Sequence, residues 1–145
     1  MNDRLIRKME TADIDEVVDI WYEASIVAHN FIPKDFWDAN RAVMKNKYMP
    51  MSEAYVFIDG EQILGFIALI DEYLAAIFVK PESQGRGIGS SLLSHVKNLR
   101  DHLQLKVYDK NKKSINFYRN KGFSVISESF DSDTGEHELI MEWTK

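Results

Sequence analysis

Residues Val79–Gly89 read VKPESQGRGIG, and Ser90-Ser91-Leu92-Leu93 follow them directly. The apolar run Leu74–Val79 that leads into this stretch has the β-branched and aromatic content of a buried strand. Beyond the glycines, apolar residues recur at helical spacing, namely Ile88, Leu92, Leu93, Val96 and Leu99. The segment is therefore predicted to form a strand, a glycine-rich turn and a helix.

A turn of this kind can surround one anionic group with backbone N–H groups, because glycine has no Cβ to block the approach. The helix that follows adds four unpaired N-terminal donors and the positive end of its dipole. A phosphate-bearing ligand at Gln84–Gly89 is the first hypothesis.

Three other interpretations of the turn compete with one another. A P-loop requires Gly-Lys-Ser/Thr, but Ser90 follows Gly89 with no lysine. A dinucleotide-binding turn would explain Asp109, which lies 20 residues after Gly89 and follows a predicted strand. However, Ser90 stands where G-x-G-x-x-G needs its third glycine, and the turn begins five residues beyond the strand. A solvent loop is the remaining alternative, and three glycines in five residues at a helix start count against it.

Composition limits the class of protein. The 145 residues favour one domain, 1–145, and the 45% of apolar residues can fill a single core. The net charge of −5 argues against a general nucleic-acid or membrane surface. The chain has no cysteine, which excludes disulfides and a thiol nucleophile, and its histidines show no metal spacing. No apolar run approaches the ~20 residues of a membrane span, so a cytoplasmic protein is expected.

The remaining elements follow from hydrophobic periodicity and turn signals. Helices are predicted from Thr11 or Asp13 to Ala28, with Ile14, Val17, Val18, Trp21, Ala24, Ser25 and Ala28 on one face, from Pro33 to Tyr48, and from Ser114 to Lys121. Strands are predicted at Leu5–Met9, Ala54–Ile58, Ile63–Ile70, Tyr73–Val79, Gln104–Tyr108, Ser124–Asp131 and His137–Trp143. This order favours a mixed α/β (α+β) fold, a mostly antiparallel seven-stranded sheet with helices on both faces.

Two motifs stand out, Gln84–Gly89, which reads QGRGIG, and Asn111–Phe123, which reads NKKSINFYRNKGF. Together they resemble the signatures Q/R-x-x-G-x-G/A and N-x-x-(small)-x-x-F-Y-x-x-x-G-F of the GNAT superfamily of acyl-CoA-dependent N-acyltransferases. The separation of the motifs and the order of elements also match, over essentially the whole chain. The segment Ala28–Ile32 is similar to small stand-alone bacterial members of the YiaC/YjaB type.

The resemblance implies acetyl-CoA as acyl donor and a splayed pair of central strands. Backbone groups of Ile77, Phe78 and Val79 would pair with the pantetheine arm, and one amide there could stabilise the oxyanion. The residues implied to hold the pyrophosphate are Gln84, Gly85, Arg86, Gly87, Ile88 and Gly89. Asn111 matches the asparagine that contacts the cofactor arm, although a helix-capping role is also open.

Tyr118 stands at the position of the family's general acid, whereas Phe117 is expected in the core. A phenol with a pKa of about 10 stays protonated at neutral pH and can donate to the leaving thiolate. The lack of cysteine excludes an acyl-cysteine intermediate, so direct attack by an amine in a ternary complex is implied.

That attack needs a base or a water relay, for which Glu72 and His29 are candidates and Glu23 is a weaker third. A protein lysine or a small-molecule amine is the expected acceptor. A non-catalytic acyl-CoA sensor stays open, as does an RNA-directed member, which the net charge of −5 disfavours. The resemblance also allows a homodimer formed through the C-terminal strands.

Overall fold

The computed structural model describes residues 4–145, so the first three residues of the predicted domain lie outside the described residues. Its strands are β1 (Arg4–Lys8), β2 (Glu53–Asp59), β3 (Gln62–Ile70), β4 (Tyr73–Val79), β5 (His102–Tyr108), β6 (Ser124–Asp131) and β7 (Glu136–Thr144). Its α-helices are α1 (Ile14–Ala28), α2 (Lys34–Val43), α3 (Met49–Met51), α4 (Ile88–Lys97) and α5 (Lys112–Asn120). Short 3₁₀ turns occur at η1 (Thr11–Asp13) and η3 (Pro81–Ser83), and η2 (Met44–Tyr48) is π-helical.

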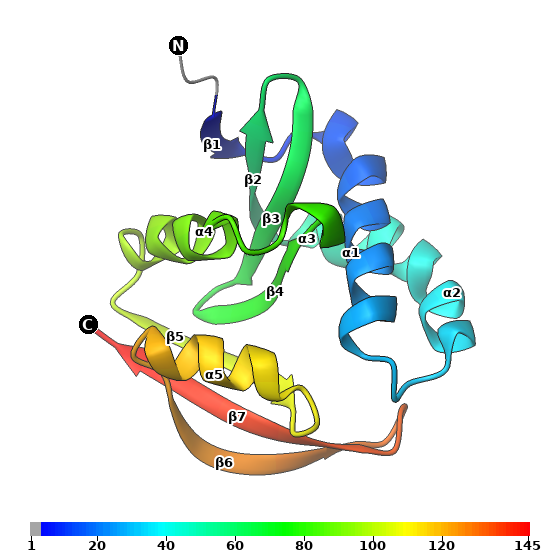
Figure 1. Ribbon diagram of the computed structural model, residues 1–145, viewed down its shortest axis with the longest axis vertical. Coiled ribbons are helices and arrows are strands. Elements are labelled where there is room, and N and C mark those ends of the chain that lie inside the picture. The colour runs from blue at the N-terminus through cyan, green and yellow to red at the C-terminus, as the bar shows by residue number, and fades with distance from the viewer. Residues whose placement is uncertain (1–3) are drawn as a thin grey trace.

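The seven strands form one sheet in the order β1-β2-β3-β4-β5-β7-β6. Every neighbouring pair is antiparallel except β4 and β5, which run parallel. The expected fold class, a mostly antiparallel mixed sheet, is confirmed. In Figure 1, β1 to β4 occupy the upper part of the molecule and β5 to β7 lie across the lower part.

Each face of the sheet carries its own apolar core. On one face α1 and α2 pack against the sheet through buried side chains such as Val17, Trp21, Trp37 and Phe66. On the other face the core side chains of α4 and α5 include Leu92 and Tyr118. Helices on both faces were expected, and Figure 1 shows α1 and α2 to the right of β4, α4 to its left and α5 over β5 and β7.

The second predicted helix differs from the structure. The pattern predicted one helix from Pro33 to Tyr48, whereas α2 ends at Val43 and continues through the π-helical η2 into α3. A π-helical turn shifts the side chains that follow it around the axis. Met49 is thereby buried in the core, while Tyr48 is 43% exposed.

Two local features shape β3 and β4. A Cβ on Gly65 would lie 2.9 Å from the Phe78 carbonyl oxygen, so the backbones of β3 and β4 approach each other closely at this glycine. The β3–β4 register steps from Ala68↔Ala76 to Leu69↔Leu74, which makes Ala75 the extra residue of a β-bulge.

One smaller expectation also needs correction. Ala28, expected on the buried face of the first helix, is exposed. Within residues 4–145 no helix is both long and apolar enough to span a bilayer.

Candidate active site

The sheet opens between its two central strands. In the described register β4 and β5 pair at one position, Tyr73↔Gln104, close to where the Gln104 N–H donates to the Glu72 carbonyl oxygen at 3.0 Å. From there toward Val79 the strands diverge, as Figure 1 also shows. One edge of β4 therefore keeps backbone N–H and C=O groups that β5 does not pair, and such groups can bind an extended ligand as an added strand.

A cleft of about 870 Å³ fills this opening. Its walls come from α1, the α2–η2 segment, β4, β5, β7, the N-terminal end of α4 and one side of α5. The cleft brings together most residues that the sequence singled out: His29, Ile77, Phe78, Val79, Gln84, Gly85, Gly87, Ile88, Gly89, Asn111 and Tyr118. Of the described turn residues 84–89, Arg86 alone does not line it.

The glycine turn adopts a backbone that other residues avoid. Gly85 and Gly87 have φ values of 82° and 81°, in the left-handed region. A Cβ on either residue would meet no heavy atom within 4 Å, so glycine is needed here for conformation and not for space. Gln84 is held against the strand end, since its Nε2 donates to the Val79 carbonyl oxygen at 3.2 Å.

The turn leads directly into the N-terminus of α4. The Ser91 N–H donates to the Gly87 carbonyl oxygen at 3.0 Å, which starts the helical hydrogen bonding. The N–H groups of Ile88, Gly89 and Ser90 precede that bond at the helix end, where the dipole favours an anion. The Ile88 side chain is buried in the core, so only its backbone is available to a ligand.

Asn111 caps α5 and also faces the cleft. Its Oδ1 accepts a hydrogen bond from the Ser114 N–H at 3.2 Å, and its Nδ2 lies 3.3 Å from Nε2 of His29. Both roles considered for this residue are therefore compatible, since the cap fixes the side chain beside the cleft. The contact also joins α1 to α5 across the open end of the sheet.

His29 is a buried, neutral histidine. Its ring stacks on Trp37 with the ring centroids 5.3 Å apart, and its Nδ1 has no hydrogen-bond partner among the described residues. Burial without a charged partner lowers the pKa of His29 from 6.5 to about 4. The imidazole therefore carries no charge at neutral pH and is a weak base.

Tyr118 is buried at the floor of the cleft. Burial, with a smaller effect from the charge of neighbouring Tyr73, raises the pKa of Tyr118 above its usual value. Its hydroxyl therefore stays protonated at neutral pH, as a proton donor must. Phe117, expected in the core, packs against the core edge but also lines the cleft.

Two of the three candidate bases lie elsewhere. Glu72 lies in the turn between β3 and β4, and its exposed carboxylate is 3.5 Å from Nδ1 of His102. Glu23 is exposed on α1. Neither belongs to the residues described as lining the cleft. Because a base must reach the reacting amine directly or through a water, Glu72 and Glu23 could act only across the cleft rim, and their role stays a prediction.

The structure adds a carboxylate that the sequence pattern did not single out. Glu138, on β7, lines the cleft opposite Tyr108 of β5. Burial and the nearby charge of Asp131 raise the pKa of Glu138, while Lys106 and a hydrogen bond from Ser129 at 3.5 Å act the other way. Burial, with a smaller effect from the nearby charge of Glu138, raises the pKa of the Tyr73 phenol. Among the described residues no group of three or more His, Cys, Asp or Glu side chains could hold a metal ion.

Comparison with known proteins gives a consistent result. A family model described as an acetyltransferase (GNAT) domain matches residues 50–125. The peptidyl-lysine N-acetyltransferase YiaC of Escherichia coli K12 is 30% identical over 140 residues, covering 96% of both chains.

Two solved structures share the fold closely. The solution structure of apo YjaB from Escherichia coli has a TM-score of 0.86 at 23% identity and covers 97% of each chain. The PaiA N-acetyltransferase of Thermoplasma acidophilum, solved in complex with coenzyme A, has a TM-score of 0.82 at 20% identity. That alignment covers 98% of this chain and 99% of the other.

Proposed function

Because this chain belongs to the GNAT acetyltransferase family, we propose that it transfers the acetyl group of acetyl-CoA to a primary amine by direct attack in a ternary complex. One observation carries the proposal: the open edge of β4 ends at a left-handed glycine turn and a helix N-terminus. A CoA thioester has an extended amide-bearing arm joined to a pyrophosphate, and these two parts of the site match the arm and the phosphates respectively.

The residues proposed to bind acetyl-CoA follow the cleft from one end to the other. The pyrophosphate would accept hydrogen bonds from the backbone of Gln84–Gly89, and the exposed Lys113 on the cleft wall adds a nearby cation. The arm would pair with β4 at Ile77, Phe78 and Val79. Asn111 would contact the arm from the far wall. Arg86 is not among the residues that line the cleft, so beyond its backbone N–H it would contribute the long-range attraction of its guanidinium.

The proposed reaction needs one proton donor and one proton acceptor. The amine nitrogen forms a bond to the thioester carbonyl carbon, and the carbon–sulfur bond then breaks. Tyr118 donates its hydroxyl proton toward the departing sulfur, so that coenzyme A leaves as the thiol. A β4 backbone N–H beside the bulge at Ala75 would hold the oxyanion, because a bulge turns backbone groups out of the sheet ladder.

Glu138 is the proposed proton acceptor. It lines the cleft, and its raised pKa makes its carboxylate a stronger base toward the acceptor ammonium group. His29 also lines the cleft, but a pKa of about 4 makes it a poor acceptor, so it is proposed to position Asn111. Replacing Glu138 with glutamine is expected to lower turnover at neutral pH, with the loss partly recovered at alkaline pH where the amine is itself neutral.

A protein lysine is the acceptor that the relatives favour, since YiaC and YjaB are both named peptidyl-lysine N-acetyltransferases. A cytoplasmic location remains an expectation from the sequence. Pairing of two copies through the C-terminal strands is also an expectation from the sequence. The exposed Ile126 and Phe130 on the edge strand β6 are compatible with it.

Release of coenzyme A thiol separates an enzyme from a sensor. The purified protein is incubated with acetyl-CoA and, in turn, lysine-containing peptides, free lysine and polyamines, and thiol release and acetylated product are measured. We expect release that depends on the acceptor, with lysine peptides among the active ones. Tight acetyl-CoA binding without release for any acceptor would instead support the non-catalytic sensor.

A further inference from the structure

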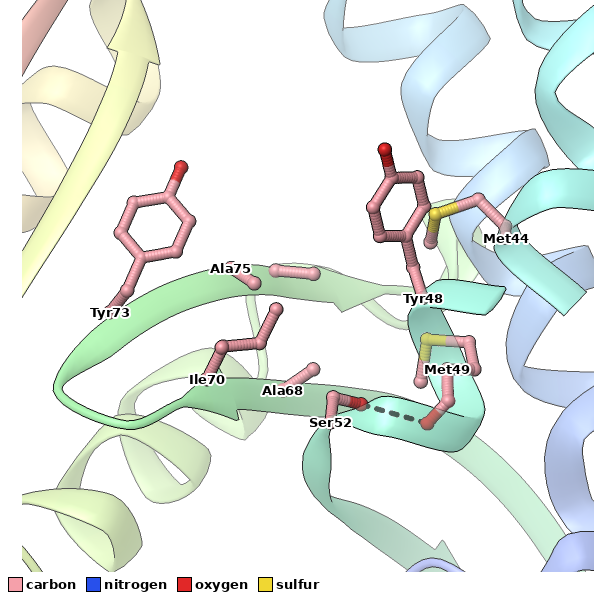
Figure 2. Close-up of a pocket in the computed structure, with 9 residues that line it drawn as sticks. Met44, Tyr48, Met49, Ser52, Ala68, Ile70, Tyr73 and Ala75 are labelled. Carbon is pink, nitrogen blue, oxygen red and sulfur yellow. Dashed lines mark hydrogen bonds between the residues drawn. The ribbon is translucent and has the colours of Figure 1, made fainter. Parts of the chain in front are cut away.

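A second pocket opens beside the reaction cleft. It has a volume of about 250 Å³ and lies between the β3–β4 hairpin and the segment η2–α3. Figure 2 shows the rings of Tyr73 and Tyr48 at its two ends, with both hydroxyls pointing away from the hairpin. Between them, Ala68, Ile70 and Ala75 form the floor, and Met44 and Met49 form the side wall. We call this space the side pocket.

The sequence creates the side pocket by placing small residues in the strands. Ala68 of β3 pairs with Ala76 of β4, and the bulge adds Ala75 next to them. Three alanines therefore lie next to one another on β3 and β4, and their small side chains leave space above the strands. The π-helical η2 brings Met44 and Tyr48 over this shallow area.

The side pocket is continuous with the cleft, because Met44, Tyr73, Ala75 and Ala76 line both. The proposed path of the CoA arm runs along β4 from Val79 toward Ala75. The side pocket begins where that path ends, at the level where the acyl group of a thioester would lie. An acyl chain longer than acetyl would have this space next to it.

The lining also limits what the side pocket can hold. Its residues include no carboxylate, lysine, arginine or histidine, and the methionine and aliphatic side chains are apolar. An ammonium group would lose hydration there without gaining a partner. The acceptor amine is instead matched by Glu138, which lines the main cleft and not the side pocket. The side pocket is thus apolar, whereas the main cleft, which Tyr73 also lines, offers a carboxylate to the amine.

We propose that the side pocket holds the alkyl part of acyl groups longer than acetyl, so that the protein also transfers propionyl and butyryl groups. This inference rests on the proposed function. A cavity of about 150 Å³ is enough for benzene, and the side pocket is larger, so a butyryl chain fits within it. The bonds made and broken stay the same: carbon–nitrogen forms, carbon–sulfur breaks, and the proton passes to sulfur.

The test compares acyl donors with one acceptor. Steady-state kinetics are measured with acetyl-, propionyl- and butyryl-CoA and one active lysine peptide. Each buried methylene favours binding by up to about fourfold. We therefore expect the KM for butyryl-CoA to be no higher than that for acetyl-CoA, with kcat/KM within about tenfold.

Two variants fill the side pocket from below. Ile70→Trp and Ala68→Leu each add volume at a position that lines only the side pocket. In either variant the ratio of butyryl to acetyl kcat/KM should fall about tenfold, the loss of most of two methylene contributions. Leu5→Phe is the matched control, because Leu5 is 50% exposed on β1 and its replacement should leave the ratio unchanged.

Acetyl transfer in the same samples separates this inference from the proposed function. Acetyl transfer with no butyryl transfer by the wild-type protein would overturn the side-pocket assignment alone. An unchanged ratio of butyryl to acetyl kcat/KM in both filled variants would overturn it as well. The variants could at the same time lose activity toward peptides with apolar residues next to the lysine. That last result would identify an acceptor side chain as the occupant.

Discussion

At the scale of a single residue, Tyr118 is the proposed proton donor. Its side chain is buried and lines the same cleft as the open edge of β4, and burial raises the pKa of its hydroxyl, which therefore stays protonated at neutral pH. Tyr118→Phe removes the proton donor and almost no volume. We expect kcat to fall by about 100-fold or more, the usual contribution of a general acid, while acetyl-CoA affinity measured by calorimetry changes little.

Tyr55→Phe is the control for this substitution. Tyr55 donates its hydroxyl proton to Glu53 and lies outside the cleft lining. Its loss should leave kcat unchanged. A Tyr118→Phe variant with wild-type turnover would show that the thiolate leaves without help from this phenol.

The lowered pKa of His29 makes the stability of the folded protein depend on pH. Its pKa is about 4 in the folded protein and 6.5 without burial. Above pH 6.5 both states hold the neutral ring. As the pH falls toward 4, the unfolded chain takes up a proton that the native state resists, so stability is lost. At pH 5 the loss is about 2 kcal/mol for this group.

Urea unfolding of the wild type and of His29→Asn, at pH 7.5 and pH 5, measures this contribution. Asparagine does not titrate, so the variant should lose about 2 kcal/mol less than the wild type over the same interval. Equal losses in the two proteins would mean that His29 titrates normally in the folded state.

Single residues also show where sequence reasoning stopped. Tyr118 and Asn111 were found because both belong to one continuous signature with fixed spacing. Glu138 and Tyr73 were missed, since each reaches the cleft through strand pairing that no local pattern records. Glu72 looked suitable by its position before the central strand, but a residue in that turn faces His102 and solvent.

At the scale of elements, the glycine turn before α4 depends on a left-handed backbone. Gly87 caps α4 with φ at 81°, and a side chain there would be strained although the space is open. A left-handed backbone costs a non-glycine residue roughly 1–2 kcal/mol. Gly87→Ala is therefore expected to weaken CoA binding by about tenfold or more as the turn relaxes.

Gly60→Ala provides the matched comparison. Gly60 has φ at 64° and equally open surroundings, but it lies in the β2–β3 turn. Both variants should lose similar stability in thermal unfolding, and only Gly87→Ala should lose affinity for CoA in titration calorimetry. Equal affinities would indicate that the turn does not hold the phosphates.

Elements with regular periodicity were predictable, and the interruptions within them were not. The strands Tyr73–Val79 and Ser124–Asp131 were expected with the bounds that the structure has. The bulge at Ala75 could not be predicted, because a continuous apolar run gives no sign of one extra residue. The π-helical η2 was likewise hidden in an unbroken helical pattern.

On the scale of the whole molecule, the sheet consists of two halves that meet at Tyr73↔Gln104. The strands β1 to β4 and the strands β5 to β7 each form continuous ladders. Their arrangement followed from the order of elements and the family resemblance. The extent of the gap between the halves did not, since it depends on long-range packing of α1, α4 and α5 around it.

Hydrogen exchange can detect a ligand in this gap. In the protein alone, β4 amides that do not bond to β3 should exchange quickly, whereas those within the β3–β4 ladder should be protected. Saturating CoA should slow the first group and change the second little. Exchange that is equally fast with and without CoA would rule out pairing of the arm with β4.

An unpaired strand edge is also a hazard, because it can accept a strand from another molecule. Most proteins leave such edges at the periphery of a sheet, where charges or prolines protect them, but here the bare edge lies in the middle of the molecule. Occupancy by the cofactor would then guard the folded chain against self-association as well as supply the acyl group. The solubility of this protein would accordingly follow the coenzyme A supply of its surroundings.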